Sequence, residues 1–375
     1  MKRMKKILIS ILSLVLVLSC LFGCASLGKT MMTLEESELS ANMVKLFLSR
    51  YKGMLSVSVS ASNSDTYWDT IVDNKQGTTN NDVHTEYGLN MAKTYLAAMH
   101  VFEERGLSLS DETIDAVDER IRELITAEGS KAALNEELAK YGANVEILRE
   151  TYLIEEKMNM LIDDLYGEDG NLIDEGEKNA FYMQNYRRFR QIYIPLYRFV
   201  YETDENGDEV RKTDENGKYV IRELTDAEMA DTEARIAKIE EQIVSKDYEG
   251  FDDLVETYDE EPNDTSETYP QGFYLSPDSA YEVTAVKEAL FSMETGEYRT
   301  VIPSDGHGVY IIMRYENEEN GYTKEENKDF FTAFTSELKN HKVEEYLERY
   351  KAEIVIDESV AKGVDMKSVE ANLYY

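Results

Sequence analysis

Residues 190–194 read Arg-Gln-Ile-Tyr-Ile, a short apolar stretch typical of a buried β-strand. A similar stretch far downstream, Gly-Val-Tyr-Ile-Ile at 308–312, is the second such strand. All five prolines lie in residues 195–303, between the two strands. The proline-free regions on either side show apolar residues at helical spacing, as in 91–102 and 145–165. These patterns predict an α+β fold in which a region of strands and helices lies between two helical regions.

The patterns divide the chain into five segments. We expect a signal peptide at 1–23, a tether at 24–33, an N-terminal helical domain at 34–187, the sheet domain at 188–316, and a C-terminal helix and tail at 317–375 that complete the helical domain. One helix boundary is marked clearly: Ser110 is a good N-cap, Asp111 and Glu112 suit the first turn, and Gly129 ends the helix. The C-terminal helix is expected over 325–350.

The N-terminus predicts export. Four basic residues precede an uncharged apolar run at 7–18, which is short for a membrane span and typical of a secretion signal. The run leads to Leu21-Phe22-Gly23-Cys24, which resembles the lipobox of bacterial lipoproteins, and Cys20 ends a weaker match. We expect lipidation at Cys24 and cleavage before it. An uncleaved anchor helix is the alternative, and both place the chain on the outer face of the cytoplasmic membrane.

Cysteine content and charge exclude several functions. The only two cysteines lie in the signal region, so the mature chain has no thiol for a disulfide, a zinc site or a nucleophile. The formal charge is −35, and loss of the basic signal makes the mature chain more acidic still. Such a surface repels nucleic acid and anionic lipid headgroups, which leaves basic stretches of unfolded polypeptides as possible targets.

The middle region carries two near-repeats, Asp-Glu-Asn-Gly at 204–207 and again at 214–217. Asn-Gly is a strong tight-turn signal, so we expect one or two protruding hairpins near 201–222. A calcium loop is the alternative. Its spacing does not match an EF-hand, because no Glu closes a twelve-residue loop. We therefore expect neither a metal site nor a cofactor.

Four segments in order resemble a parvulin-type peptidyl-prolyl isomerase domain: 190–194, 251–258, 286–298 and 308–312. They are similar to the family's first strand, its "F..LA..YS" helix, its "F..A.F.L..GE.S" segment and its closing "G-Y-H-I-I" strand. Over about residues 34 to 356 the chain resembles the PrsA/SurA class of extracytoplasmic foldases, and 104–111 with the helices after it is similar to a SurA-type chaperone domain. The resemblance implies that a parvulin-like domain, with a small antiparallel sheet and helices, is inserted into a helical SurA-like chaperone domain. It also implies that both domains handle unfolded protein.

The resemblance also implies a site, and this sequence departs from it. Active parvulins carry two histidines on adjacent central strands, near an acidic residue or cysteine. Here Gln191 and Tyr310 occupy the histidine positions, and Glu261 falls near the acidic one. His307 lies close to Tyr310 but before the strand. If the domain is active, Gln191, Glu261 and Tyr310 are the expected catalytic residues.

The family's apolar proline pocket is also changed. The residues expected to line it are Val286, Phe291, Met293 and Phe273. Val286 replaces a pocket aromatic, whereas Phe291 keeps one.

Two function classes follow from these features. The favoured one is a binding module that shields unfolded or nascent exported polypeptides, with weak or no prolyl isomerase activity. The alternative is a working isomerase, which must lower a barrier of about 18–20 kcal/mol by favouring a twisted amide. A scaffold for cell-envelope assembly is a third and weaker hypothesis.

Overall fold

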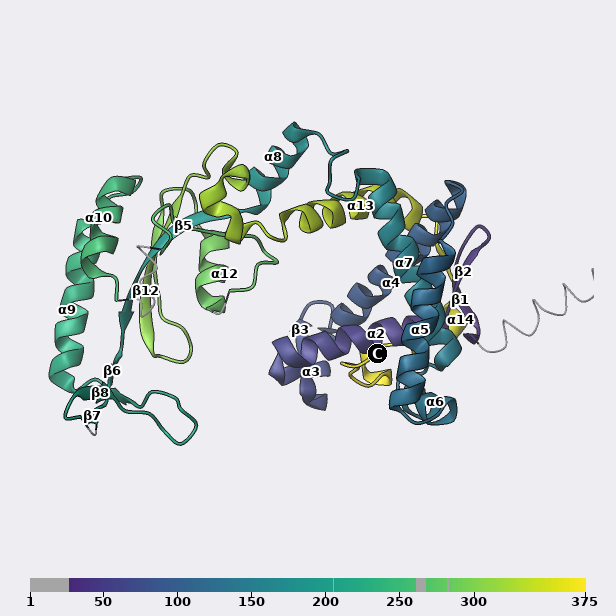
Figure 1. Cartoon of the computed structure of the whole chain (residues 1–375), viewed down its shortest axis with the longest axis horizontal. Coiled ribbons are helices and arrows are strands. Elements are labelled where there is room, and N and C mark those ends of the chain that lie inside the picture. The colour runs from purple at the N-terminus through teal and green to yellow at the C-terminus, as the bar shows by residue number, and fades with distance from the viewer. Residues whose placement is uncertain (1–26, 205, 261–267, 282) are drawn as a thin grey trace, which may run out of the picture. The chain divides into compact units, whose positions relative to one another are not determined.

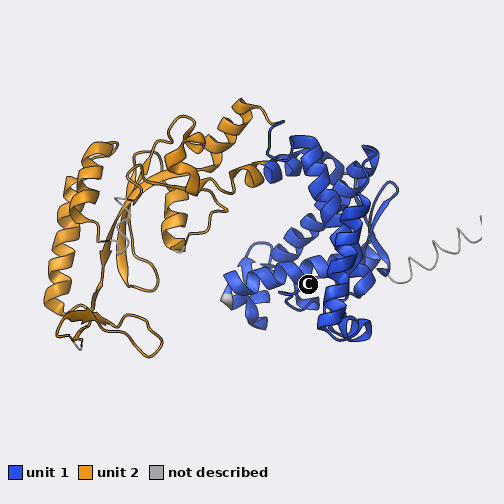
Figure 2. Ribbon diagram, in the orientation of Figure 1, with its two compact units in different colours: residues 1–172, 339–375 blue, residues 173–338 orange. Residues whose placement is uncertain are grey.

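The structure, a computed structural model, describes residues 27–204, 206–260, 268–281 and 283–375. The chain forms two compact units, coloured separately in Figure 2. Unit 1 contains the residues up to Leu172 together with Lys339–Tyr375, and unit 2 contains Ile173–Leu338. Helices and small antiparallel sheets occur in both units. The α+β class expected from the sequence is therefore confirmed.

Unit 1 consists mainly of packed helices (Figure 1). Its helical elements are α2 (Ala41–Ser58), η1 (Ser60–Asn63), α3 (Asp65–Trp68), α4 (Asn80–Glu104), α5 (Asp111–Ala127), α6 (Lys131–Ala139), α7 (Val145–Tyr166), most of α13 (Phe334–Lys351), α14 (Glu358–Ala361) and η4 (Met366–Ser368). The long helix α4 packs on α2 and α7, and Phe47 stacks on Tyr95 at 4.7 Å between ring centroids. Ser110 caps α5 as expected, by accepting a hydrogen bond from the Thr113 N–H.

A small sheet joins the two ends of the chain within unit 1. Its strands, in the order β13-β1-β2, are β1 (Thr30–Leu34), β2 (Ser37–Ser40) and β13 (Val355–Ile356). Met32 pairs with Ile356 on one side and with Leu39 on the other. This corrects the tether expected over 24–33, because its last residues are fixed in a strand. A separate hairpin, β3 (Ile71–Asp73) with β4 (Thr78–Thr79), leads into α4.

The C-terminal segment of unit 1 is bound to α2. The Asn372 N–H donates to the Ser49 carbonyl at 2.9 Å. The Lys52 ammonium donates to the carbonyls of Met366 and Val369, both at 2.8 Å. Backbone polar groups of the tail therefore find partners on a helix from the other end of the chain.

Unit 2 is built around a four-stranded antiparallel sheet in the order β10-β5-β12-β11. Its strands are β10 (Phe273–Leu275), β5 (Arg187–Pro195), β12 (Gly308–Tyr315) and β11 (Tyr298–Val301), and its helices are α8 (Glu175–Asn185), α9 (Asp226–Gln242), α10 (Tyr248–Tyr258) and α12 (Thr284–Ser292). Side chains alternate between the faces of each strand, so each face has its own core. Ile192, Ile311 and their neighbours pack under α9 and α10, whereas Phe189 and Ile312 pack under α12 (Figure 1).

The insertion between β5 and α9 is a long ribbon with two turns. Its strands are β6 (Tyr197–Phe199), β7 (Tyr201–Thr203), β8 (Glu209–Arg211) and β9 (Ile221–Glu223), paired as β6 with β9 and β7 with β8. In each turn an Asp carboxylate accepts backbone N–H groups: Asp204 from Asn206 and Asp208, and Asp214 from Asn216 and Lys218. These hydrogen bonds lower the pKa of both carboxyls. The acidic repeats thus serve turn formation.

Unit 2 is longer than the 188–316 segment expected for the sheet domain. It also holds α8 and two 3-10 turns, η2 (Gly321–Thr323) and η3 (Glu325–Phe330). An aromatic cluster joins these elements. The ring centroids of Tyr186 and Phe331 lie 4.9 Å apart, and those of Tyr182 and Tyr322 lie 5.4 Å apart. The continuous helix expected over 325–350 is therefore wrong at its start, because Phe331 leaves helical geometry to join this cluster, and α13 begins at Phe334.

The expected signal peptide at 1–23 and both cysteines, Cys20 and Cys24, lie outside the described residues. Within the described ranges, no helix has the length and apolar character needed to cross a membrane.

Candidate functional site

The two positions implied by the resemblance lie on the central strands of the unit 2 sheet. Gln191 is on β5 and Tyr310 is on β12, and the strands are directly hydrogen-bonded. Gln191 pairs with Ile312, and Tyr310 pairs with Tyr193. Because paired residues of an antiparallel sheet point to the same side, all four side chains share one face. Gln191 and Tyr310 are diagonal neighbours on the face that α12 covers in part.

The Gln191 amide is held in place. Its side chain is only 5% exposed, and its Oε1 accepts a hydrogen bond from the Tyr281 hydroxyl at 2.8 Å. Tyr281 precedes α12 and packs edge-on against Phe189 of β5. Burial of an amide requires such a partner, and Tyr281 provides it. Sequence reasoning missed Tyr281, because it lies in a loop without any periodic pattern.

The second position presents a phenol ring. Tyr310 packs against Tyr193 with ring centroids 4.9 Å apart. Gly308 makes room for this pair, since a Cβ there would lie 2.2 Å from the Tyr193 ring. The residues that follow α10 fix the backbone of Tyr193. Its N–H donates to the Asp259 carboxylate at 2.7 Å, and its carbonyl accepts from the Glu260 N–H at 2.9 Å. The face thus offers phenols and an amide.

The remaining expected site residues take different places. Glu261 lies outside the described residues. Val286 and Met293 are buried in the core between α12 and the sheet, which favours a packing role for both. Phe273 and Phe291 are half-buried at the edge of the same core. The structure therefore brings Gln191 and Tyr310 together on one face, and of the four expected pocket residues the two phenylalanines remain partly accessible.

The four histidines are all outside this face. They are His84 and His100 on α4, His341 on α13, and His307, which is exposed just before β12. The His84 ring is held between the hydroxyls of Tyr51 and Tyr67, at 2.8 and 3.0 Å. Desolvation lowers its pKa. The imidazole of His307 lies 6.1 Å from the Tyr197 ring. No imidazole therefore belongs to β5 or β12.

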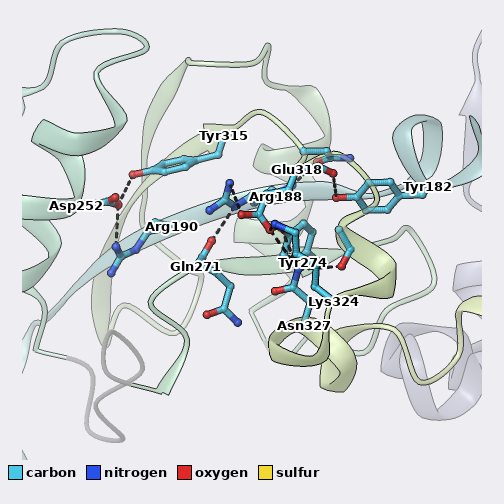
Figure 3. Close-up of polar contacts among 12 residues, drawn as sticks. Tyr182, Arg188, Arg190, Asp252, Gln271, Tyr274, Tyr315, Glu318, Lys324 and Asn327 are labelled. Atoms are coloured by element: carbon cyan, nitrogen blue, oxygen red, sulfur yellow. Dashed lines mark hydrogen bonds and ion pairs between the residues drawn. The ribbon is translucent and has the colours of Figure 1, made fainter. Parts of the chain in front are cut away.

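On the opposite face, an ion pair between a buried arginine and a partly exposed aspartate fixes α10 to the sheet (Figure 3). Arg190 of β5 contacts the Asp252 carboxylate at 2.8 Å, and the same oxygen accepts from the Tyr315 hydroxyl at 2.6 Å. Burial, followed by the hydrogen bond to Asp252, raises the pKa of Tyr315. Arg190 is almost completely buried, so the Asp252 carboxylate offsets the cost of removing the guanidinium from water.

A second polar cluster fixes the segment after β12 to the sheet (Figure 3). One Glu318 oxygen accepts from the Tyr274 hydroxyl at 2.7 Å and lies 3.2 Å from the Lys324 ammonium, and the other lies 3.5 Å from Arg188. Asn327 also donates to this carboxylate, at 3.3 Å. Burial alone raises the pKa of Glu318, but the Tyr274 hydrogen bond and the Arg188 charge outweigh it, so the pKa is lowered.

This cluster predicts acid sensitivity of unit 2. A carboxyl whose pKa is lower in the folded state stabilises it fully above the unfolded-state pKa of 4.5, and the stabilisation is lost as pH falls through the folded-state value. We therefore expect the urea concentration at the unfolding midpoint of unit 2 to decrease as the pH is lowered from 6 to 3. Glu318→Gln should lower the midpoint at pH 6 and flatten this dependence.

The matched control is Glu319→Gln, which removes the neighbouring, exposed carboxylate. It should leave both the midpoint and its pH dependence close to those of the unmodified chain. Equal flattening by the two variants would show that the acid response comes from general charge instead of the Glu318 cluster.

No protein-family model matches this chain, and neither does any curated protein sequence. Among solved structures, the chain is similar to PrsA from Bacillus subtilis, with 17% identity, coverage of 79% of this chain and 93% of that chain, and a TM-score of 0.20. It is similar to foldase protein PrsA from Streptococcus pneumoniae, with 12% identity, coverage of 76% and 90%, and a TM-score of 0.22. For the foldase protein PrsA of Lactococcus lactis the identity is 14%, the coverage 90% and 98%, and the TM-score 0.21. Likenesses at such low TM-scores are too weak to assign a function, which therefore has to come from the chain's own residues.

Proposed function

We propose that this protein is a lipid-anchored extracytoplasmic chaperone of the foldase type, which binds unfolded exported polypeptides and has weak or no prolyl isomerase activity. The observation that carries the proposal is the pair of central-strand positions in unit 2. An amide already bonded to Tyr281 and a phenol packed on Tyr193 stand at Gln191 and Tyr310. The partly exposed Tyr310 phenol suits contact with a peptide, whereas the Gln191 amide is buried and already bonded to Tyr281.

Rate enhancement demands more than contact. An isomerase must favour the twisted amide over the planar one, which takes polar groups preorganised at one point. Gln191 does not titrate and is nearly inaccessible, and the expected pocket residues Val286 and Met293 are buried. The face therefore supports holding a peptide better than twisting one.

Unit 1 adds exposed apolar side chains on α2, β3 and α4, and of these elements α2 and α4 pack on each other. Tyr51 of α2 packs on Tyr87 of α4 with ring centroids 4.8 Å apart. The exposed large apolar side chains of these elements are Met54, Val57, Ile71, Val72, Val83 and Tyr87. Exposed apolar surface marks interaction sites and suffices to hold an unfolded client.

The test is suppression of client aggregation by the chain from Ala25 onward, which contains every described residue. We expect near-equimolar chain to slow light scattering by a chemically denatured client. Ile71→Ser with Val72→Ser should weaken this several-fold, by analogy with the loss of apolar hot spots. Leu172→Ser with Val355→Ser removes two apolar side chains elsewhere in unit 1 that are somewhat more exposed than Ile71 and Val72, and it should have little effect. Unchanged aggregation with the unmodified chain would contradict the proposal.

Histidine at both central positions should restore part of the missing chemistry. We expect Gln191→His with Tyr310→His to raise the isomerisation rate of a proline tetrapeptide by about tenfold, short of the 10²–10³ that one preorganised donor supplies. The buried Val286 and Met293 limit the gain. The single variants Gln191→His and Tyr310→His are the controls and should each give less. A folded double variant with no gain would show that these two positions do not limit activity.

Anchoring is tested at the lipobox. Replacing Cys24 with Ala should abolish fatty-acid labelling in the host and leave the precursor uncut, because the thiol that carries the lipid is gone. Cys20→Ala is the matched control and should be labelled normally. Loss of labelling only in Cys20→Ala would show that Cys20 carries the lipid. Labelling that persists in both variants would contradict the lipoprotein assignment.

A further inference from the structure

A pocket of about 270 Å³ lies in unit 2 where β5 leaves the sheet and the insertion begins. Its wall includes Tyr197, Phe199, Tyr201, Arg198, Arg211 and Glu260. Most of these residues come from the insertion, and Glu260 follows α10. The pocket is distinct from the Gln191 and Tyr310 face but adjoins it through the end of β5.

One wall of the pocket is aromatic because of strand periodicity. Residues 197, 199 and 201 alternate along an extended segment, so their rings project to one side. Tyr197 meets Phe199 edge-on with centroids 5.4 Å apart, and Phe199 meets Tyr219 in the same way at 5.7 Å. Tyr201 is 50% exposed. Rings held in this way present apolar area to an extended partner at low entropic cost.

The other feature of the pocket is positive charge without a carboxylate partner. The Arg211 guanidinium lies 4.1 Å from the centre of the Phe199 ring, and Arg198 donates to the Tyr197 carbonyl at 3.0 Å. Neither arginine forms an ion pair with any residue that the structure describes. The Glu260 carboxylate already forms an ion pair with Arg235 of α9. In a chain with 75 acidic and 40 basic side chains, two such guanidiniums beside an aromatic wall are complementary to an external carboxylate.

We propose that this pocket binds an extended polypeptide segment in which an Asp or Glu side chain lies next to an aromatic one. The aromatic side chain packs on Tyr197, Phe199 and Tyr201, while the carboxylate pairs with Arg211. This inference rests on the proposed function, since it names the client chemistry that unit 2 selects.

The pocket is continuous with the central strands. The Leu196 N–H donates to the His307 carbonyl at 2.8 Å, and the Tyr197 ring lies 6.1 Å from the His307 ring. His307 immediately precedes β12, which carries Tyr310. A segment seated in the pocket can therefore run on towards Tyr193 and Tyr310, so the insertion selects which part of a client reaches that face.

The experiment measures fluorescence anisotropy of labelled twelve-residue peptides with the chain from Ala25 onward. Three peptides share one sequence except at the centre, which is Glu-Phe-Glu, Gln-Phe-Gln or Glu-Ser-Glu. The Glu-Phe-Glu peptide should bind about tenfold more tightly than either of the others, because a charge-assisted contact and an aromatic contact are each worth about that much.

Variants locate the effect. Arg211→Gln should remove the preference for Glu over Gln, and Tyr201→Ser should reduce the preference for Phe over Ser. Lys218→Gln is the matched control, because it removes an exposed cation of the same insertion that does not line the pocket. It should leave both preferences unchanged.

The outcomes separate this inference from the proposed function. Equal binding of all three peptides, or equal losses in Arg211→Gln and Lys218→Gln, would overturn the pocket assignment even if client aggregation is still suppressed. Tight binding of Glu-Ser-Glu would also overturn it, since it would indicate a site for anions alone. The unmodified chain could instead show a peptide preference that Arg211→Gln removes, but fail to slow client aggregation. That result would support the pocket and contradict the chaperone function.

Discussion

Replacing Asp252 with alanine is expected to destabilise unit 2 by about 2–3 kcal/mol, because it leaves a buried guanidinium without its partner. Arg190 loses the carboxylate at 2.8 Å, and the Tyr315 hydroxyl loses its acceptor at 2.6 Å. Asp252 is itself 37% exposed, so water recovers part of the loss and keeps the cost at the lower end for a buried pair. The same contacts fix α10 to β5 and β12.

The measurement is chemical denaturation followed by two signals. Near-UV circular dichroism reports on the aromatic side chains of both units, whereas fluorescence of Trp68, the single tryptophan, reports on unit 1 alone. Asp252→Ala should lower the first midpoint and leave the Trp68 fluorescence transition unchanged. The control Asp253→Ala removes an exposed carboxylate from the same helix and should shift neither signal by more than about 0.5 kcal/mol. Equal shifts from both variants would contradict the role given to the ion pair.

Alanine at Gly53 should destabilise unit 1 by about 2 kcal/mol, although alanine is normally the better helix former by about 0.5–1 kcal/mol. A Cβ on Gly53 would lie 2.1 Å from the Asn372 carbonyl oxygen and 2.6 Å from its carbon. Both are backbone atoms, so the C-terminal segment must move, and the bond from the Asn372 N–H to Ser49 is lost. The change should appear as an earlier Trp68 transition and faster proteolysis near residue 372.

A truncated chain supplies the control for this second effect. In a chain that ends at Glu370 the clashing residue is absent, so Gly53→Ala should there be neutral or slightly stabilising. The difference between the two backgrounds isolates the contact, as in a double-mutant cycle. The same destabilisation in both would show that Gly53 is required for a reason other than the tail.

Sequence patterns predicted the elements whose signals are local. The apolar stretches at 190–194 and 308–312 form the centre of the sheet, as β5 and β12. The Asn-Gly turns lie at the tips of the ribbon, with an Asp carboxylate organising each one. A turn or a strand needs only its own residues to be recognisable.

Other features depend on contacts between distant segments. Met32 and Ile356 pair although almost the whole chain separates them, and β13 is too short to show a pattern of its own. Helix α13 begins late because Phe331 packs on Tyr186, which no local signal reveals. Tertiary contacts override helical periodicity at such points.

The candidate site shows the same division. Gln191 and Tyr310 could be named in advance from the resemblance, and they lie together on one face. Tyr281, which holds the Gln191 amide, could not, because its loop has no pattern. Val286 of α12 and Met293, which follows α12, were expected at a pocket but are buried in the core, since the sequence does not tell which side of this segment meets the sheet. The pocket beside Arg211 arises only when the folded insertion brings Arg211 close to the end of β5 and to Glu260.

The central claim is that unit 2 contacts polypeptides without the groups needed for isomerisation, and one paired measurement tests it most directly. The chain from Ala25 onward is assayed for isomerisation of a proline tetrapeptide and, in the same preparation, for suppression of client aggregation. The account predicts marginal acceleration of isomerisation, if any, together with slowed aggregation near equimolar ratio. Robust isomerisation that drops in Tyr310→Phe or Glu261→Ala would contradict it and would make those residues the working site of an isomerase.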